Sequence, residues 1–264
     1  MDPEYVLVYA DLYRKHWWWR AREEFVFELL SNHLAGRGPQ RILDVGCGGG
    51  LFFDRLGELG EVEGVEIDVS MRTGIEAIDS RIHWGTVGTL PEGRRYDVVL
   101  LLDVLEHSAD PESLLGFVLG VLAPGGLTVI TVPAFPILWT NHDEVNQHLR
   151  RYTKRSLQAL TSRLGLRALS LNYFFHWTFP AKLLMRMFEG RWKNTAGPSK
   201  LPTVPVSPVN RALFLLSRLE QRTGLWHWCP FGSSLLFLGT NESSCRPVID
   251  VSRVRILPEE TSDS

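Results

Sequence analysis

The sequence has few cysteines, little excess charge and no long apolar run, and each shortage excludes a class of protein. Its three cysteines, Cys47, Cys229 and Cys245, lie far apart and form no C-x-x-C pair, so the pattern predicts neither a disulfide framework nor a zinc cluster. A formal net charge of -2 provides no basic surface for a nucleic acid backbone, and we expect no nucleic acid partner. We therefore expect a reducing, cytoplasmic compartment and a small-molecule ligand.

The lack of a long hydrophobic run has a consequence for membranes. No uninterrupted apolar stretch approaches the roughly 18 residues that a transmembrane helix needs. The first residues, Met1 to Tyr9, carry Asp2 and Glu4 instead of the basic region of a secretory signal. With 264 residues and 44% hydrophobic content, the chain is long enough to bury one full core, and we expect one domain with an appended element.

A glycine-rich segment lies between two strand-like runs in the first part of the chain. Residues 41–45 lead into residues 46–50 (GCGGG), and a second run, from Val62, ends at Glu66. In an open α/β sheet this order forms a nucleoside site, because glycines permit a sharp turn and a close approach of the backbone to the ligand. The carboxylate of Glu66 is then placed to accept hydrogen bonds from the hydroxyls of a ribose.

The same segment distinguishes two classes of adenosine ligand. A dinucleotide fingerprint, G-x-G-x-x-G counted from Gly46, requires a glycine where this chain has Leu51. Asp44 precedes the turn, and its carboxylate would repel a pyrophosphate but attract a sulfonium or ammonium group. The turn therefore favours S-adenosylmethionine (SAM) over NAD.

Strand-like and helical stretches alternate along the chain. The strand-like runs are 41–45, 62–67, 81–84, 96–102, 127–132, 166–174 and 233–240. Helical stretches begin near Leu51, Ser70 and Pro111, and a further helix runs from its N-cap Thr153 to Leu164. This alternation predicts an α/β fold with a doubly wound sheet.

Four segments together resemble one large enzyme family. They are the LDVGCGGG turn, Glu66, the YDVVLLLDVLEH segment from Tyr96 to His107 and the LAPGGLTVITVPA segment from Leu122 to Ala134. Through these segments the chain resembles the class I SAM-dependent methyltransferases over residues 40–174 and again at the last strand. The resemblance implies a seven-stranded sheet in which only the last strand is antiparallel, with SAM as the cofactor across the carboxyl ends of the first strands.

The resemblance also implies a set of cofactor-binding residues. They are Asp44, Gly46, Cys47, Gly48, Glu66, Ile67, Thr86, Val87 and Asp103. The turn would contact the methionine part of SAM, and the segments at Ile67 and 85–87 would contact the adenine. Many relatives carry an acidic residue where Thr86 stands, so here the contact with the adenine amino group passes to the backbone or to a hydroxyl.

Three side chains with acid–base chemistry follow the run 96–102. If Asp103 opens a helical turn, then Asp103, Glu106 and His107 share one face beside the donor methyl group. His107 is our first candidate for a general base. Two alternatives stay open: a similar spacing in quinone-biosynthesis O-methyltransferases has been read as a divalent-ion site, or the residues only brace the SAM-binding loop and the next helix. We expect no bound metal.

A second polar cluster, residues 139–152, follows the fifth strand-like run. This position lies at the edge where α/β sheets bind ligands. His142 is our second candidate base, and His148 could also deprotonate or orient an acceptor. Arg150 or Arg151 could bind a carboxylate or phosphate on the acceptor. The alternative is a solvated connection held by internal salt links.

The segments outside the core complete the predicted domain organisation. We expect an N-terminal helical lid (1–40), a SAM-binding core (41–174), a helical insertion or cap (175–232), a final core strand (233–245) and a disordered polar tail (246–264). Three adjacent tryptophans, Trp17 to Trp19, cannot all face one side of a helix, so at least one packs elsewhere or covers a ligand. The insertion mixes apolar residues with Lys and Arg, which favours peripheral membrane contact, a lipid-like acceptor or a homodimer contact.

These patterns together predict a SAM-dependent methyltransferase that acts on a small, largely apolar acceptor. O-methylation is favoured because two histidines are available as bases for a hydroxyl. An N- or C-methyltransferase is the nearest alternative. A nonenzymatic SAM-binding protein and a dehydrogenase are the alternatives from other classes.

Overall fold

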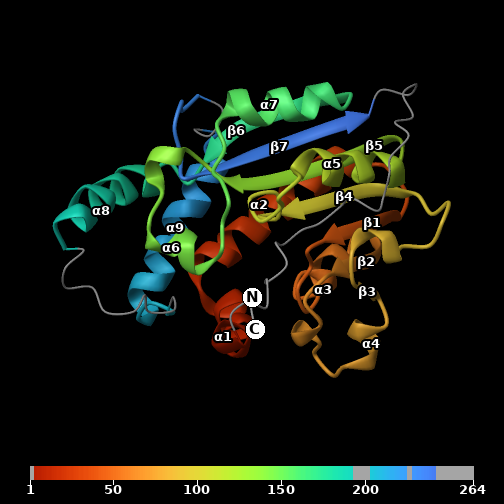
Figure 1. Ribbon diagram of the computed structural model, residues 1–264, viewed down its shortest axis with the longest axis horizontal. Coiled ribbons are helices and arrows are strands. Elements are labelled where there is room, and N and C mark those ends of the chain that lie inside the picture. Colours follow the sequence, from red (N-terminus) through yellow and green to blue (C-terminus); the bar gives the residue numbers. More distant parts are fainter. Residues whose placement is uncertain (1–2, 193–202, 225–227, 242–264) are drawn as a thin grey trace, which may run out of the picture.

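A seven-stranded sheet forms the centre of the computed structural model, which describes residues 3–192, 203–224 and 228–241 (Figure 1). The strands are β1 (Gln40–Val45), β2 (Gly60–Glu66), β3 (Ile82–Trp84), β4 (Tyr96–Leu102), β5 (Leu122–Pro133), β6 (Leu166–Phe174) and β7 (Ser234–Asn241). Their order across the sheet is β3-β2-β1-β4-β5-β7-β6. β7 is antiparallel to both neighbours, and the other pairs are parallel. The predicted doubly wound sheet with an antiparallel last strand is confirmed.

The helices differ in length from those predicted. The longer ones are α1 (Pro3–Lys15), α2 (Trp17–Leu34), α5 (Pro111–Val121), α7 (Lys154–Arg163), α8 (Thr178–Trp192) and α9 (Ser207–Arg222), and the short ones are α3 (Phe53–Leu56), α4 (Glu76–Asp79) and α6 (Asn141–Val145). The predicted helices near Leu51 and Ser70 are therefore reduced to short pieces. Glycine explains both, since Gly57 follows α3 directly and Gly74, with φ +73°, interrupts the chain before α4.

Alternate residues of the strands face opposite helical layers, as the two-residue repeat of a β-strand requires. Ile42, Val98 and Leu100 pack into one cluster with α2 and α3. Leu43 and Val45 pack into the other cluster, with α5 and α7. All five side chains are fully buried, and burial of each such side chain stabilises the fold by about 1.5–3 kcal/mol. The ends of β1 and β4, where the site lies, are thus held by packing on both faces.

One helix of the late insertion, α9, packs against the N-terminal helix α2, and Figure 1 shows the two side by side. Asn210 in α9 accepts from the Trp17 N–H at 2.9 Å and donates to the Lys15 carbonyl at 2.7 Å. Gln221 donates to the carbonyl of Ala21 at 3.2 Å. These hydrogen bonds join segments at least 193 residues apart in the chain, so α9 fixes the position of α2.

Predictions for the remaining segments have different outcomes. Thr153 is the N-cap of α7, as predicted, because its hydroxyl accepts a hydrogen bond from the Ser156 N–H at 3.2 Å. In the part of the chain that the structure describes, no helix combines the length and the apolarity needed to cross a bilayer. The predicted disordered tail, 246–264, lies outside the described residues, as does Cys245.

Candidate active site

A cavity of about 510 Å³ opens at the carboxyl ends of β1, β2 and β4. This is the edge at which open α/β sheets bind ligands. Residues from α1, α2, α6 and α8 complete its walls. The predicted site residues that line it are Gly46, Gly48, Glu66, Ile67, Asp103, His107 and His142. The structure therefore brings both candidate bases into the same cavity as the glycine turn.

The glycine turn after β1 requires glycine for steric reasons. Gly46 has φ +72°, and a Cβ atom there would lie 2.7 Å from Val104 Cγ2. Gly48 has φ +55°, and a Cβ atom there would lie 3.1 Å from Met71 Cε. The Gly46 N–H donates to the Val65 carbonyl at 2.8 Å, which ties the turn to β2. The backbone at Gly46 and Gly48 thus forms the cavity surface without intervening side chains.

Glu66 holds the turn and faces the cavity at the end of β2. Its Oε2 accepts from the Gly48 N–H at 2.8 Å, and its Oε1 accepts from the Asp68 N–H at 2.9 Å. Burial raises the pKa of Glu66, while these two hydrogen bonds oppose the shift. Each carboxylate oxygen keeps further acceptor capacity, so Glu66 can still accept hydrogen bonds from a diol.

Four residues predicted to bind the cofactor do not line the cavity. Asp44 is buried at the end of β1, and burial raises its pKa to about 7. The Cys47 side chain points into the core, where its Sγ fills the space beside Gly64. Val87 is fully buried in the core, and Thr86 is exposed to solvent. Contacts of these four residues with a cofactor stay predictions. They would have to involve the backbone, or, for Asp44, the charge of the carboxylate at longer range.

Asp103 forms an ion pair with Arg22, which is 5% exposed and lies on α2. Asp103 has φ +57°, and the residues after it form a turn instead of a helix. The expectation that Asp103, Glu106 and His107 share one face of a helical turn is therefore wrong. The positive φ redirects the chain, so Asp103 pairs with a residue 81 positions earlier in the sequence.

The aromatic residues of α1 and α2 form an apolar wall. Trp17, Trp18 and Trp19 all line the cavity together with Tyr9. The Arg22 guanidinium lies 5.1 Å from the centre of the Trp18 ring. α2 begins at the cavity with these three residues, and Trp17 and Trp19 are at the same time part of the hydrophobic core.

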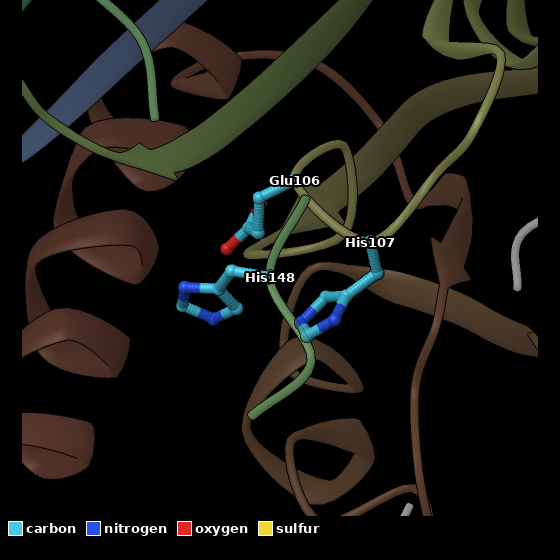
Figure 2. Close-up of side chains that lie close together, drawn as sticks. All are labelled: Glu106, His107 and His148. Atoms are coloured by element: carbon cyan, nitrogen blue, oxygen red, sulfur yellow. The ribbon is translucent and has the colours of Figure 1, made fainter. Parts of the chain in front are cut away.

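Glu106, His107 and His148 converge on one point of the cavity, and Figure 2 shows Glu106 and His107 reaching it from the loop after β4 and His148 from the segment after α6. One nitrogen or oxygen atom of each lies within 4.8 Å of the others. Glu106 is fully buried, and within the described residues neither of its carboxylate oxygens has a hydrogen-bond partner. Burial and the charge of Asp103 raise the pKa of Glu106 well above its ordinary range. Burial and His148 lower the pKa of His107 to about 4, so its ring is neutral.

His148 is oriented by a fully buried carboxylate, Asp143. The His148 Nδ1 lies 2.8 Å from Asp143 Oδ1. Arg151 donates to both oxygens of the same carboxylate, at 2.8 and 2.9 Å. Burial opposes ionisation of Asp143, but the hydrogen bonds from His148 and Arg151 prevail and lower its pKa. Asp143 therefore stays charged and accepts a hydrogen bond from the Nδ1–H of His148, which leaves the Nε2 lone pair of that ring available.

Comparison with known proteins identifies the family. Residues 18–171, more than half of the chain, match the methyltransferase domain family. The chain belongs to this family. It is 31% identical over 144 residues to the ubiquinone biosynthesis O-methyltransferase of Idiomarina loihiensis, with 48% of this chain and 58% of the relative covered. It is 27% identical over 172 residues to the protein of the same name from Burkholderia multivorans, with 57% and 66% covered. The chain thus spans less than two thirds of the length of these relatives.

Solved structures agree on the fold of the methyltransferase. Phosphoethanolamine N-methyltransferase 2 of Haemonchus contortus, in complex with phosphomonomethylethanolamine and S-adenosylhomocysteine, matches with a TM-score of 0.55 at 13% identity. The match covers 92% of this chain and 58% of that one. The domain match confirms the predicted methyltransferase family and the solved structures confirm its fold, for which SAM is the expected cofactor.

Several cavity residues of the methyltransferase were not predicted from the sequence, above all Arg22, Tyr9 and Lys182. Arg22 carries a signal that could have identified it. It lies four residues after Trp18 and four before the buried Val26, so it is a charged residue in an apolar helical stripe. A charge in that position needs a buried partner. The sequence gives no comparable signal for Lys182, which lies in the insertion among other basic residues.

Proposed function

We propose that the methyltransferase transfers a methyl group from SAM to a hydroxyl of a small, largely apolar acceptor. One observation carries the proposal: the glycine turn, Glu66 and the histidines His107, His142 and His148 line the same cavity. A donor bound at the turn would therefore face the side chains that can take a proton from an acceptor. The apolar walls, from the tryptophans of α2 and from Met185 of α8, favour an apolar acceptor body.

Gly46, Gly48 and Glu66 would hold the donor. The open backbone at the two glycines fits the amino acid part, and the Glu66 carboxylate fits the ribose hydroxyls. SAM supplies an activated methyl group on a sulfonium, and its transfer is an in-line displacement in which positive charge disappears. The protein therefore contributes mainly by alignment and by exclusion of water.

His148 is the best-supported general base among His107, His142 and His148. Asp143 fixes its tautomer and orientation at 2.8 Å, which is how a carboxylate prepares an imidazole to accept a proton. His107 lies beside it, with ring centroids 4.8 Å apart. His107 and His142, the bases predicted from the sequence, stay candidates, but among the described residues neither has a carboxylate that orients its ring as Asp143 orients His148.

The curated relatives support oxygen as the acceptor atom. Their name, ubiquinone biosynthesis O-methyltransferase, describes methyl transfer to oxygen, and a base for a hydroxyl is what the cavity offers. We therefore propose a phenolic or similarly acidic hydroxyl, because its proton is the easiest for an imidazole to remove.

Methyl transfer can be tested without knowledge of the acceptor. The purified protein is incubated with a cell extract and SAM labelled with deuterium in the methyl group, and products are detected by mass spectrometry. We expect one or a few small molecules that gain the labelled methyl group, and fragmentation should place it on oxygen. A protein that binds S-adenosylhomocysteine (SAH) but labels nothing would contradict the enzymatic proposal, and label on nitrogen or carbon would contradict O-methylation.

A metal-assisted form of the same reaction is the second candidate. Glu106, His107 and His148 offer one oxygen and two nitrogens within 4.8 Å of one another, a donor set that suits a divalent transition metal. Two features favour it: Glu106 has orphaned buried oxygens, and the hydrogen bond from His148 to Asp143 is the outer support that a metal-bound imidazole usually has. A bound metal would acidify the acceptor hydroxyl.

Metal content and activity separate the two forms. The protein is purified without chelator, its zinc, manganese and magnesium are measured by inductively coupled plasma mass spectrometry, and turnover is compared before and after dialysis against a chelator. The metal-assisted form predicts bound metal, loss of turnover on dialysis and recovery on re-addition. Unchanged turnover in a metal-free protein would contradict the metal-assisted form and support catalysis by a histidine base without a metal.

A further inference from the structure

Lys182 is a cation in the cavity wall that no part of the proposed reaction uses. It lies on α8 and is partly buried. Thr178, Lys182 and Met185 are spaced by four and three residues and all line the cavity, so one face of α8 forms this wall. Within the described residues, no hydrogen bond or ion pair involves the Lys182 ammonium group, whereas Asp103 and Asp143 are both paired with arginines.

The other cationic side chains near the acceptor end are already engaged. Arg151 donates to the Asp143 carboxylate through two nitrogens and to the Ala134 carbonyl at 2.9 Å. Arg150 donates to the Ala109 carbonyl at 3.2 Å. The expectation that Arg151 binds an anionic acceptor group therefore does not fit its contacts, because its guanidinium is committed to the fold.

The carboxylates of the cavity are no more available to Lys182. Asp103 is neutralised by Arg22. Glu66 accepts two backbone hydrogen bonds at the donor end of the cavity. Glu106 is fully buried, and among the described residues neither of its carboxylate oxygens has a hydrogen-bond partner, so it does not pair with Lys182. Among the described residues, no carboxylate of the cavity therefore forms an ion pair with the Lys182 ammonium group.

An uncompensated ammonium in a cavity wall is unfavourable in the free protein. Burial and the charge of Arg151 lower the pKa of Lys182 to about 8, because both make the charged form of the side chain less favourable. A bound anion would remove it, and a charge-assisted hydrogen bond to the ammonium would orient the acceptor.

We propose that the methyl acceptor carries an anionic group, a carboxylate or an equivalent oxyanion, that binds to Lys182. The proposal rests on the proposed function, since it assigns the acceptor half of the same cavity. It refines the expectation of a largely apolar acceptor: the body packs against the tryptophans and Met185, and the anionic end lies at α8. Specificity for an acid over its neutral analogue would therefore depend on one side chain of the insertion.

Matched acid and amide probes test this inference. The complex of the protein with SAH is titrated by calorimetry with phenols in pairs, for example 3-(4-hydroxyphenyl)propanoate and 3-(4-hydroxyphenyl)propanamide. The wild type is expected to bind at least one acid about tenfold more tightly than its amide. Lys182→Met should abolish this difference and leave amide binding unchanged, whereas Lys182→Arg should keep most of it.

Arg186 provides the matched control, because it lies one turn further along α8 and is exposed. Arg186→Met should keep the preference for acids, and thermal melting should confirm that both methionine variants fold. A wild type that binds no acid more tightly than its amide, whether or not it binds either, overturns the inference, as does a preference that survives in Lys182→Met. Binding of SAH and labelling from deuterated SAM are measured separately, so a failure of the proposed function appears as missing methyl transfer and is distinguishable.

Discussion

Asp44 is a buried carboxylate at the end of β1, and its charge is costly in the free protein. Its pKa rises from 3.8 to about 7, mainly through burial. Between these pH values the folded protein keeps a proton that the unfolded chain has lost, so stability falls as pH rises and the loss is complete above about pH 7. One pKa unit corresponds to about 1.4 kcal/mol, so a shift of about three units limits the loss of unfolding free energy to about 4 kcal/mol.

Asp44→Asn should therefore stabilise the free protein. The difference in melting temperature between variant and wild type is expected to be small near pH 4 and to grow up to about pH 7, as followed by thermal melting across that range. The same variant should lose affinity for SAM more than for SAH, because only SAM carries the sulfonium charge that a carboxylate attracts. Equal losses for both ligands would show that Asp44 acts only through the shape of the turn.

The histidines make separable predictions at the same scale. His148→Gln should reduce turnover by about 10²-fold or more, the usual effect of losing a general base, with SAH affinity unchanged in calorimetry. Asp143→Asn should also reduce turnover, by about tenfold or more, because the imidazole loses its fixed tautomer. His33→Gln is the control, since this exposed histidine lies at the end of α2 with its Nδ1 2.8 Å from the Leu29 carbonyl oxygen and does not line the cavity. Full turnover in His148→Gln would show that His148 is not the base and would favour His107 or His142.

The turn between β1 and α3 makes a prediction at the scale of an element. Gly46 and Gly74 have nearly the same φ, +72° and +73°, but only at Gly46 would a Cβ atom meet a neighbour, Val104, at 2.7 Å. Gly74→Ala should cost about 1–2 kcal/mol of unfolding free energy through backbone strain alone. Gly46→Ala should cost more in denaturant unfolding and should also weaken SAH binding. Equal effects of the two substitutions on SAH binding would contradict the role of this turn.

How far the sequence predicts each element depends on the range of the contacts that define it. The glycine turn and Glu66 were predicted because their geometry follows from neighbouring residues and a strand about twenty positions away. The ion pair of Asp103 with Arg22 joins residues 81 positions apart, and the orientation of His148 by Asp143 needs a fold-dependent loop. Local periodicity holds no information on such pairs. The helical turn expected at Asp103 is wrong because Asp103 has a positive φ, which a residue of this type rarely adopts and the spacing of polar residues does not reveal.

At the scale of the whole molecule, a bound ligand should link the N-terminal helices to the helix α8 of the late insertion. Residues of α1, α2 and α8 line the cavity together with the sheet edge, so bound SAH should slow hydrogen exchange in these helices and raise the melting temperature. At a concentration one hundred times its dissociation constant, the ligand stabilises the folded state by about 2.7 kcal/mol. α5 and α7 cover the opposite face of the sheet and serve as internal controls. Uniform protection of all helices would indicate global stabilisation without a local contact.

The hydrogen bonds of Asn210 to Lys15 and Trp17 have an evolutionary consequence. The residues proposed to hold the donor lie on loops of the central sheet, whereas the tryptophans of α2 and Lys182 and Met185 of α8, proposed to contact the acceptor, lie outside it, and α9 holds α2 in place. With this division, related proteins can differ in the acceptor through changes in the N-terminal helices and the insertion together, while the donor site stays the same. A chimera that exchanges only the N-terminal helices, or only the insertion, should lose the Asn210 hydrogen bonds and acceptor binding together.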